Sequence, residues 1–341
     1  MQFPHEGYAR DLHAALKGYL SANCRNATSS FSGRGVNWMC DAELNESSCS
    51  IHCFDQKGPE YLVQLSRNGH GEAVGRTAEI SDVIHAVGDW LNGAPLGDLY
   101  GSYPFIDQGK RALLSMRDEI FAQFPSMQGL VESNIHDTSG SGTDEMVLAR
   151  ADRSCRIFFY GRKPFPLAIF SWDGCEQFRF SAENVVSLAQ VVEQWILRRS
   201  MPSDAGRQFS WLKLNPVAEY YERGEPVLGE FMVSWDGIED MFSDPEFSPS
   251  TAVISLIQAM RAKGYDKTLR AGQSMFTLML SRSRRHGLRD GQPSMALQFS
   301  EGRLEAVLDE GHGERQELSQ EIEFTRELEC LLQKLVSREI D

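Results

Sequence analysis

The sequence predicts an α+β protein in which one unit is repeated three times: a helix, an antiparallel four-stranded meander sheet and a second helix, stacked along the chain. Three observations predict this fold. Apolar strand-like runs lead into tight turns at Gly69, Gly174 and Gly311, a helical pattern follows each turn, and further strand-like segments and a helix precede it. Self-similarity of this kind is typical of repeat architectures. The expected units are residues 1–106, 107–210 and 211–341, and the last contains an inserted acidic segment.

The turns predict β-hairpins. Asn68-Gly69 and Asp173-Gly174 stand between apolar runs, and glycine accepts the positive φ that two-residue hairpin turns require. Two earlier strands are expected in each unit. They are residues 35–44 and 49–54, 145–151 and 155–160, and 274–281 and 294–299.

Helices are expected before and after each sheet. Those before the sheets are residues 8–20, 110–124 and 251–262. Thr77, Ser181 and Ser319 mark the start of the later helices, because a hydroxyl at the N-cap accepts a hydrogen bond from an unpaired helical N–H. The helices should cover one face of each sheet. Two connectors with aromatic residues, 103–106 and 209–212, are expected to pack one unit against the next.

Length and composition bound the class of protein. The chain has 341 residues, of which 24% are charged and 41% hydrophobic, so wholesale disorder is excluded. It has no run of about eighteen or more apolar residues, which a membrane span would need. Residues 1–10 lack the features of a signal peptide, and the seven cysteines form no evident disulfide framework. A cytoplasmic protein is predicted, with no membrane contact.

The charge of the chain is acidic and unevenly distributed. The formal net charge is −14, and residues 201–341 contain 16 Lys and Arg against 24 Asp and Glu. Nucleic-acid binding is not expected, because it depends on cations that neutralise phosphates. A basic protein partner is predicted, while the other explanation of the charge is solubility alone.

The most distinctive acidic stretch lies between Glu219 and Glu246, where Arg223 is the one basic residue and aromatic residues are interleaved. Carboxylates can steer a basic partner, and buried aromatic residues anchor many interfaces. The predicted partner-binding residues are Glu219, Tyr221, Glu222, Glu225, Glu230, Trp235, Asp236, Glu239 and Asp240. The alternative is an amphipathic helix with its aromatic residues inward and a solvated acidic face.

The densest basic stretch is a candidate anion-binding site. It comprises Arg282, Arg284, Arg285, His286 and Arg289. Guanidinium groups bind phosphates and carboxylates. Two alternatives remain open: the charges protect a hairpin from edge pairing, or they pair with the acidic segment upstream.

A metal site is considered at Cys40, Cys49, His52 and Cys53 and is not expected. On a strand, Cys49 and Cys53 face one side and His52 faces the other, whereas zinc needs convergent ligands. Buried core cysteines are predicted instead.

No catalytic residue is assigned. The identical tetrapeptides beginning at Gly69 and Gly311 contain His70 and His312 beside carboxylates, but their place in hairpin turns favours turn chemistry over acid–base catalysis. Nucleophile, phosphate-loop, dinucleotide and zinc-protease motifs are missing from the sequence.

The predicted function is non-enzymatic protein binding, of the kind that a bacterial immunity protein or antitoxin performs when it sequesters a basic toxin or nuclease. The repeated scaffold, the acidic surplus and the aromatic residues among the acids indicate it, and no cofactor is expected. The same features fit an adaptor or chaperone for a secreted protein. A further alternative is an enzyme or small-molecule sensor with a pocket between the units.

Overall fold

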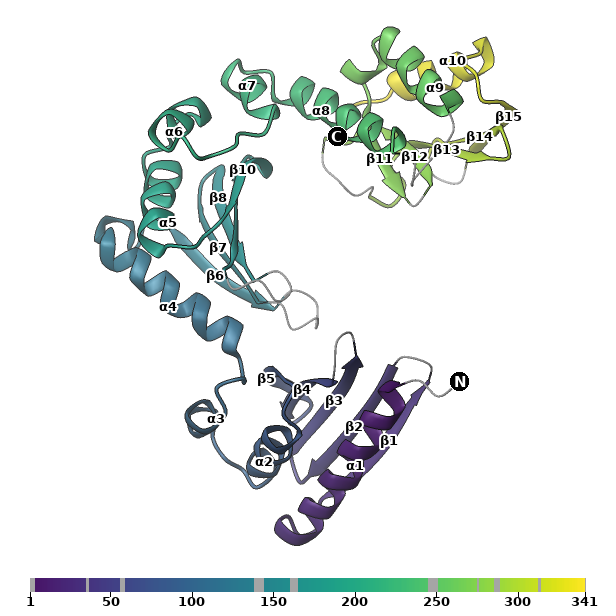
Figure 1. Cartoon of the computed structure of the whole chain (residues 1–341). Helices are drawn as coiled ribbons and strands as arrows, with labels where there is room; N and C mark the ends of the chain where they lie inside the picture. The colour runs from purple at the N-terminus through teal and green to yellow at the C-terminus, as the bar shows by residue number, and fades with distance from the viewer. Residues whose placement is uncertain are drawn as a thin grey trace. The chain divides into compact units, whose positions relative to one another are not determined.

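The computed structural model describes residues 4–34, 37–55, 59–137, 144–159, 165–244, 251–274, 276–284, 289–311 and 314–340. These residues form a mixed helix and sheet structure with three antiparallel five-stranded sheets (Figure 1). In each sheet the strands are neighbours in the order in which they occur in the chain, as predicted for a meander.

The first sheet is flanked in sequence by α1 (Pro4–Asn23) and α2 (Ile80–Leu91), and α3 (Leu96–Ser102) follows. Its strands are β1 (Thr28–Arg34), β2 (Asn37–Leu44), β3 (Ser47–Asp55), β4 (Pro59–Arg67) and β5 (His70–Thr77). Figure 1 shows α1 lying along β1 and β2.

The second sheet is preceded by α4 (Gln108–Gln123) and a 3-10 turn, η1 (Pro125–Met127). Its strands are β6 (Glu132–Asp137), β7 (Asp144–Arg150), β8 (Arg153–Phe158), β9 (Leu167–Trp172) and β10 (Cys175–Ser181). The helical segments after it are α5 (Val185–Val192), the π-helical turn η2 (Glu193–Leu197) and α6 (Pro202–Gln208).

The third sheet is preceded by four helical segments. They are α7 (Val217–Glu222), α8 (Pro226–Phe242), α9 (Thr251–Ala262) and the 3-10 turn η3 (Tyr265–Lys267). The strands are β11 (Arg270–Ser274), β12 (Thr277–Ser281), β13 (Ser294–Ser300), β14 (Arg303–Asp309) and β15 (Arg315–Glu321), followed by α10 (Arg326–Val336).

The chain divides into two compact units. One comprises residues 1–169 and 180–198, and the other, which we call the C-terminal unit, comprises residues 170–179 and 199–341. The predicted boundaries near residues 106 and 210 fall between successive sheets. Three separate domains and their stacking stay a prediction.

The predicted number of four strands per sheet is wrong, because each sheet has a fifth. The missed strand is the first one every time: Thr-Ser-Ser-Phe-Ser-Gly-Arg in β1, Glu-Ser-Asn-Ile-His-Asp in β6 and Arg-Ala-Gly-Gln-Ser in β11. These segments are polar and lack a clear apolar alternation. Each pairs on one side only, so backbone pairing with the second strand, rather than burial of side chains, determines its structure.

All three predicted helix starts are wrong. Thr77 is the last residue of β5, and α2 begins after Glu79. α5 begins after Asn184, whose side chain accepts hydrogen bonds from the N–H groups of Val186 and Ser187. α10 begins after Thr325, so Ser319 lies in β15 instead. Ser and Thr are common in both caps and edge strands, and hydroxyl position alone did not separate the two.

The hairpin prediction is confirmed at two of the turns. Asn68 and Gly69 both have positive φ, of 52° and 75°, as do Asp173 and Gly174, at 47° and 74°. At the third turn Gly311 has a φ of 83°, but the loop is longer, since the Glu310 N–H donates to the Glu314 carbonyl. His312 and Gly313 of this loop lie outside the described residues.

The core lies between the helices and one face of the sheet. In the first sheet, Cys49, Ile51 and Cys53 are buried in a cluster with α1 and α2, and His52 is on the opposite face, as predicted. In the third sheet, alternate residues of β12 to β14 pack against α8, α9 and α10. None of the helices in the described ranges combines the length and apolar composition needed to cross a bilayer.

The two aromatic connectors return to the edge of the sheet that precedes them. Ile106 forms an antiparallel bridge with Gly75 of β5, and Leu214 forms one with Phe178 of β10. The backbone N–H of Asp107 donates to Val74 O at 2.7 Å. Both connectors therefore cover the outer edge of a last strand.

Candidate functional site

The predicted acidic segment forms α7 and α8. Gly224 separates them with a left-handed φ of 77°, and Pro226 opens α8 in its first turn. Glycine adopts this conformation without steric cost, and proline is favoured at a helix start. Glu246, at the end of the predicted segment, lies outside the described residues.

The aromatic residues of this segment lie in the core. Phe231 and Trp235 are fully buried, and Tyr221 is 5% exposed. The Trp235 Nε1–H donates to Leu269 O at 2.8 Å. This is the amphipathic-helix arrangement, in which Tyr221 and Trp235 contribute to the interior of the C-terminal unit rather than presenting their rings at its surface.

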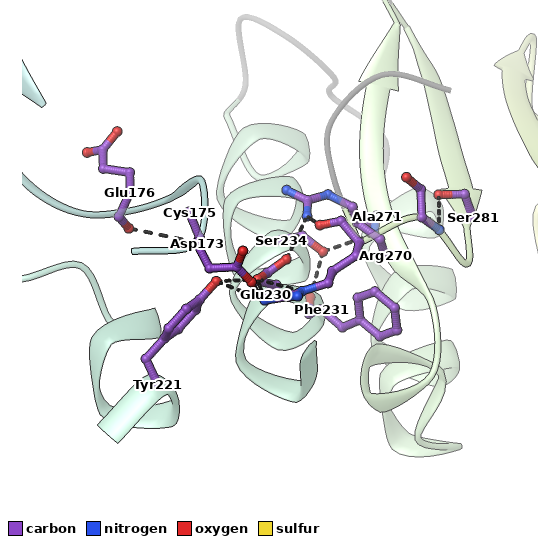
Figure 2. A network of polar contacts seen from close by, with 12 residues as sticks. Asp173, Cys175, Glu176, Tyr221, Glu230, Phe231, Ser234, Arg270, Ala271 and Ser281 are labelled. Atoms are coloured by element: carbon purple, nitrogen blue, oxygen red, sulfur yellow. Dashed lines mark hydrogen bonds and ion pairs between the residues drawn. The ribbon is translucent and has the colours of Figure 1, made fainter. Parts of the chain in front are cut away.

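A buried polar network surrounds Glu230 of α8 (Figure 2). The Tyr221 hydroxyl donates to its carboxylate, Arg284 donates to it at 3.0 and 3.1 Å, and Arg270 lies 3.9 Å away. Burial raises the pKa of Tyr221, and Glu230 and Cys175 raise it further. Burial lowers the pKa of Arg284, but attraction to Glu230 outweighs this and raises it overall. Tyr221 and Arg284 therefore keep their protons, and the network is a fixed structural group.

The predicted anion-binding residues do not converge on one point. Arg284 also pairs with Asp173 at 2.8 Å, and Arg282 donates to two backbone carbonyls, those of Thr268 and Arg338. Burial lowers the pKa of Arg282. These guanidinium groups are therefore held by the chain itself. Arg285 and His286 lie outside the described residues.

A surface cavity of about 450 Å³ lies beside this region. Arg282, Arg289 and Arg338 line it together with the acidic residues Asp290 and Glu339. The mixture of signs reduces its preference for an anion, because each carboxylate repels the ligand that the arginines attract.

The exposed face of α8 is largely neutralised within the chain. Arg261 pairs with Asp236 and Glu239, both at 2.7 Å. Burial lowers its pKa, but the two carboxylates raise it by more. Of the nine residues predicted for this site, Glu219 and Asp240 are the exposed carboxylates for which the described structure gives no partner.

The remaining acidic residues of α7 and its neighbouring loop also have partners. Glu222 accepts a hydrogen bond from the Ser203 N–H at 2.6 Å, in the first turn of α6. Glu225 lies 3.5 Å from Arg223, and both side chains are half-exposed.

A second acidic region was not predicted. Glu305, Glu317 and Glu321 are exposed on the face of the third sheet opposite its helices, around Ser319, which pairs with Glu305. Within the described residues no cation contacts these three carboxylates, and Arg303 donates to the Ser319 hydroxyl instead. Glu323 and Glu327 follow in sequence and are also exposed. We call Glu305, Glu317 and Glu321, the three glutamates on the exposed face of the sheet, the β14–β15 acidic patch.

The patch escaped sequence reasoning because its acids are spread along strands. In β15, Glu317 and Glu321 alternate with the half-buried residues Leu318 and Gln320, and Arg303 and Arg315 stand among the acids. The period of two itself was the available signal, since it places Glu317 and Glu321 on one face.

A metal-binding cluster is not assembled among the residues that the structure describes. No three His, Cys, Asp or Glu side chains there lie close enough together to hold a metal ion. Burial raises the pKa of Cys49 to about 12, so this thiol stays protonated. His70 is exposed at the start of β5.

No family model matches the chain, and no curated protein has a significantly similar sequence.

Proposed function

We propose that the chain is a non-enzymatic protein-binding protein of the immunity or antitoxin class, which sequesters a basic toxin or nuclease in the bacterial cytoplasm. The observation that carries the proposal is the β14–β15 acidic patch, whose carboxylates are exposed and without cationic partners in the described residues. Unpaired charge of one sign steers an oppositely charged protein toward the surface.

Support also comes from the scaffold. Three similar sheets, if stacked along the chain as the sequence predicts, would present broad surfaces of the kind repeat proteins use for protein partners. The unpaired glutamates of the β14–β15 acidic patch lie on the third sheet. An adaptor or chaperone for a secreted protein would use the same patch, and the identity of the captured partner distinguishes the two.

The test is capture from a lysate of the producing bacterium, followed by binding kinetics with the purified partner. Glu317→Lys/Glu321→Lys removes two acids of the patch. Glu219→Lys/Asp240→Lys removes the unpaired acids of α7 and α8 and is a matched control, because either pair of changes takes the net charge from −14 to −10.

We expect a basic partner. At low salt, the patch variant should associate at least about tenfold more slowly, and the control should remain close to wild type. Equal slowing in both variants would mean that only net charge matters. Unchanged association in the patch variant, or an acidic partner, would contradict the proposal.

A further inference from the structure

The three sheets differ in what lies against their last strand. The outer edges of β5 and β10 are each covered by the connector that follows, through the bridges of Ile106 and Leu214. At β5, the Asp107 backbone N–H donates to Val74 O at 2.7 Å, and the Asp107 side chain accepts from the Val74 N–H at Oδ1, at 2.9 Å. At β10, the Asn215 N–H donates to Gln177 O at 2.7 Å.

No such segment covers β15 in the part of the chain that the structure describes. β15 is an edge strand of its sheet, and the chain continues from it into α10 (Figure 1). The residues after α10 lead elsewhere: Arg338 accepts a hydrogen bond from Arg282 through its carbonyl and pairs with Glu310 through its side chain.

The hydrogen-bond register shows which groups of β15 point outward. Glu310 N–H donates to Glu314 O at 3.0 Å, and bonded and non-bonded pairs alternate along an antiparallel ladder. Glu317, opposite Val307, therefore lies in a non-bonded pair. Its N–H and C=O point away from β14, as those of Val74 point away from β4.

The connectors show what kind of segment fits such an edge. Each places an aliphatic residue and then Asp or Asn against the strand, Ile106-Asp107 in one case and Leu214-Asn215 in the other. At β15 the flanking side chains are Glu317 and Glu321 on the exposed face, so the complementary segment is basic.

We propose that the outer edge of β15 binds an extended basic segment of the partner protein as an added antiparallel strand. The inference rests on the proposed protein-binding function and specifies its mode. Main-chain hydrogen bonds supply affinity in such strand addition, and side chains supply selectivity.

The glutamates of β15 also have a protective effect, because charged edge strands discourage pairing between identical copies. If the β15 edges of two copies paired, Glu317 would lie near glutamates of the other copy and be repelled by them. A basic segment meets no such repulsion, so the same charges select for it. β1, β6 and β11 are edge strands as well, and no described segment of the chain pairs with their outer edges. In β11, the Ala271 N–H already donates to the hydroxyl of Ser234 in α8. The molecule offers no precedent for strand addition there.

The test uses a peptide with the sequence of residues 207–216, the chain's own second connector, which carries Arg207 and Lys213 and no acid. It is titrated against the full chain to millimolar concentration, with a scrambled peptide of the same composition as control. Hydrogen exchange reports protection of the outward amides of Glu317 and Ser319.

Two variants separate backbone from charge. Glu317→Pro removes an outward N–H without removing a bond to β14, a position where edge strands tolerate proline, and thermal melting confirms folding. Glu317→Pro should weaken binding of the connector peptide at least about fivefold at all salt concentrations, which is the effect of one lost hydrogen bond. Glu317→Ala keeps the N–H and should weaken binding only at low salt.

Each outcome of this experiment either supports or overturns strand addition at β15. Tighter binding of the connector peptide than of the scrambled one, lost in Glu317→Pro, supports strand addition. No binding of the connector peptide, or equal binding to wild type and Glu317→Pro, overturns it. Equal binding of both peptides also overturns it while leaving the acidic-patch function standing, and loss of the bacterial partner from Glu317→Lys/Glu321→Lys tests that function separately.

Discussion

Two acidic regions of the C-terminal unit, α7–α8 and β14–β15, place their carboxylates in opposite surroundings. In α7–α8, Glu230 is buried against Arg284, and Asp236 and Glu239 share Arg261. In β14–β15, Glu317 and Glu321 are exposed with no described cationic partner. The density of charge in a sequence therefore does not measure the charge that a folded surface presents.

The difference follows from the neighbours of each element. α8 contacts both β11 of the third sheet and α9, close enough to α9 for Arg261 to reach its carboxylates. β15 has a neighbouring strand on one side only. An edge strand meets fewer side chains, so its charges stay available to solvent and to other molecules.

The largest effect that separates the regions should come from Trp235→Ala. Trp235 is fully buried in α8, and removing the ring should lower the free energy of unfolding by about 4 kcal/mol. Denaturant unfolding measures it. Trp211→Ala is the matched control, since Trp211 is 50% exposed and should cost less than about 1 kcal/mol. Similar losses would contradict the placement of Trp235 in the core.

Glu230→Ala should have the next largest effect. It leaves the half-buried Arg284 and the buried Tyr221 without their shared acceptor, which should cost about 3 kcal/mol of stability. Asp240→Ala, at an exposed carboxylate of the same helix, should stay within about 0.5 kcal/mol. If the two changes were equally tolerated, Glu230 would not be a structural carboxylate.

Arg261→Ala should have a smaller effect on stability and a distinct one on charge. It removes the shared partner of Asp236 and Glu239 and should cost about 1 kcal/mol, less at high salt because partly exposed pairs are screened. With these acids unpaired, α8 should attract a basic partner more strongly than in wild type. Unchanged association kinetics would show that α8 does not face the partner.

Thiol labelling at pH 8 should distinguish the buried polar network around Glu230 from the exposed surface without any mutation. Cys330 of α10 is exposed and should react first. Cys175 lies beside Tyr221 in the buried network and is less accessible, so it should react more slowly. Burial raises the pKa of Cys49 to about 12, which leaves it as an unreactive thiol until the protein unfolds. Labelling of Cys175 as fast as Cys330 would mean that the network opens readily.

Much of the fold could be predicted from local patterns. The turns at Gly69 and Gly174 depend on backbone conformations that few residues adopt, and the helix at residues 251–262 was predicted with the bounds it has. The first strand of each sheet could not be predicted, because its polar residues carry no burial pattern and its partner strand supplies the structure.

The sequence by itself determined the tight turns at Gly69 and Gly174, the helices before each sheet and the inward face of strands such as β3. A period of two or 3.6 residues encodes which side of a strand or helix is buried. Only the tertiary structure decided which charges remain unpaired and which strand edges stay uncovered. Those properties depend on contacts between residues far apart in the chain, such as Glu230 with Arg284 and Val74 with Asp107, and no local period encodes them.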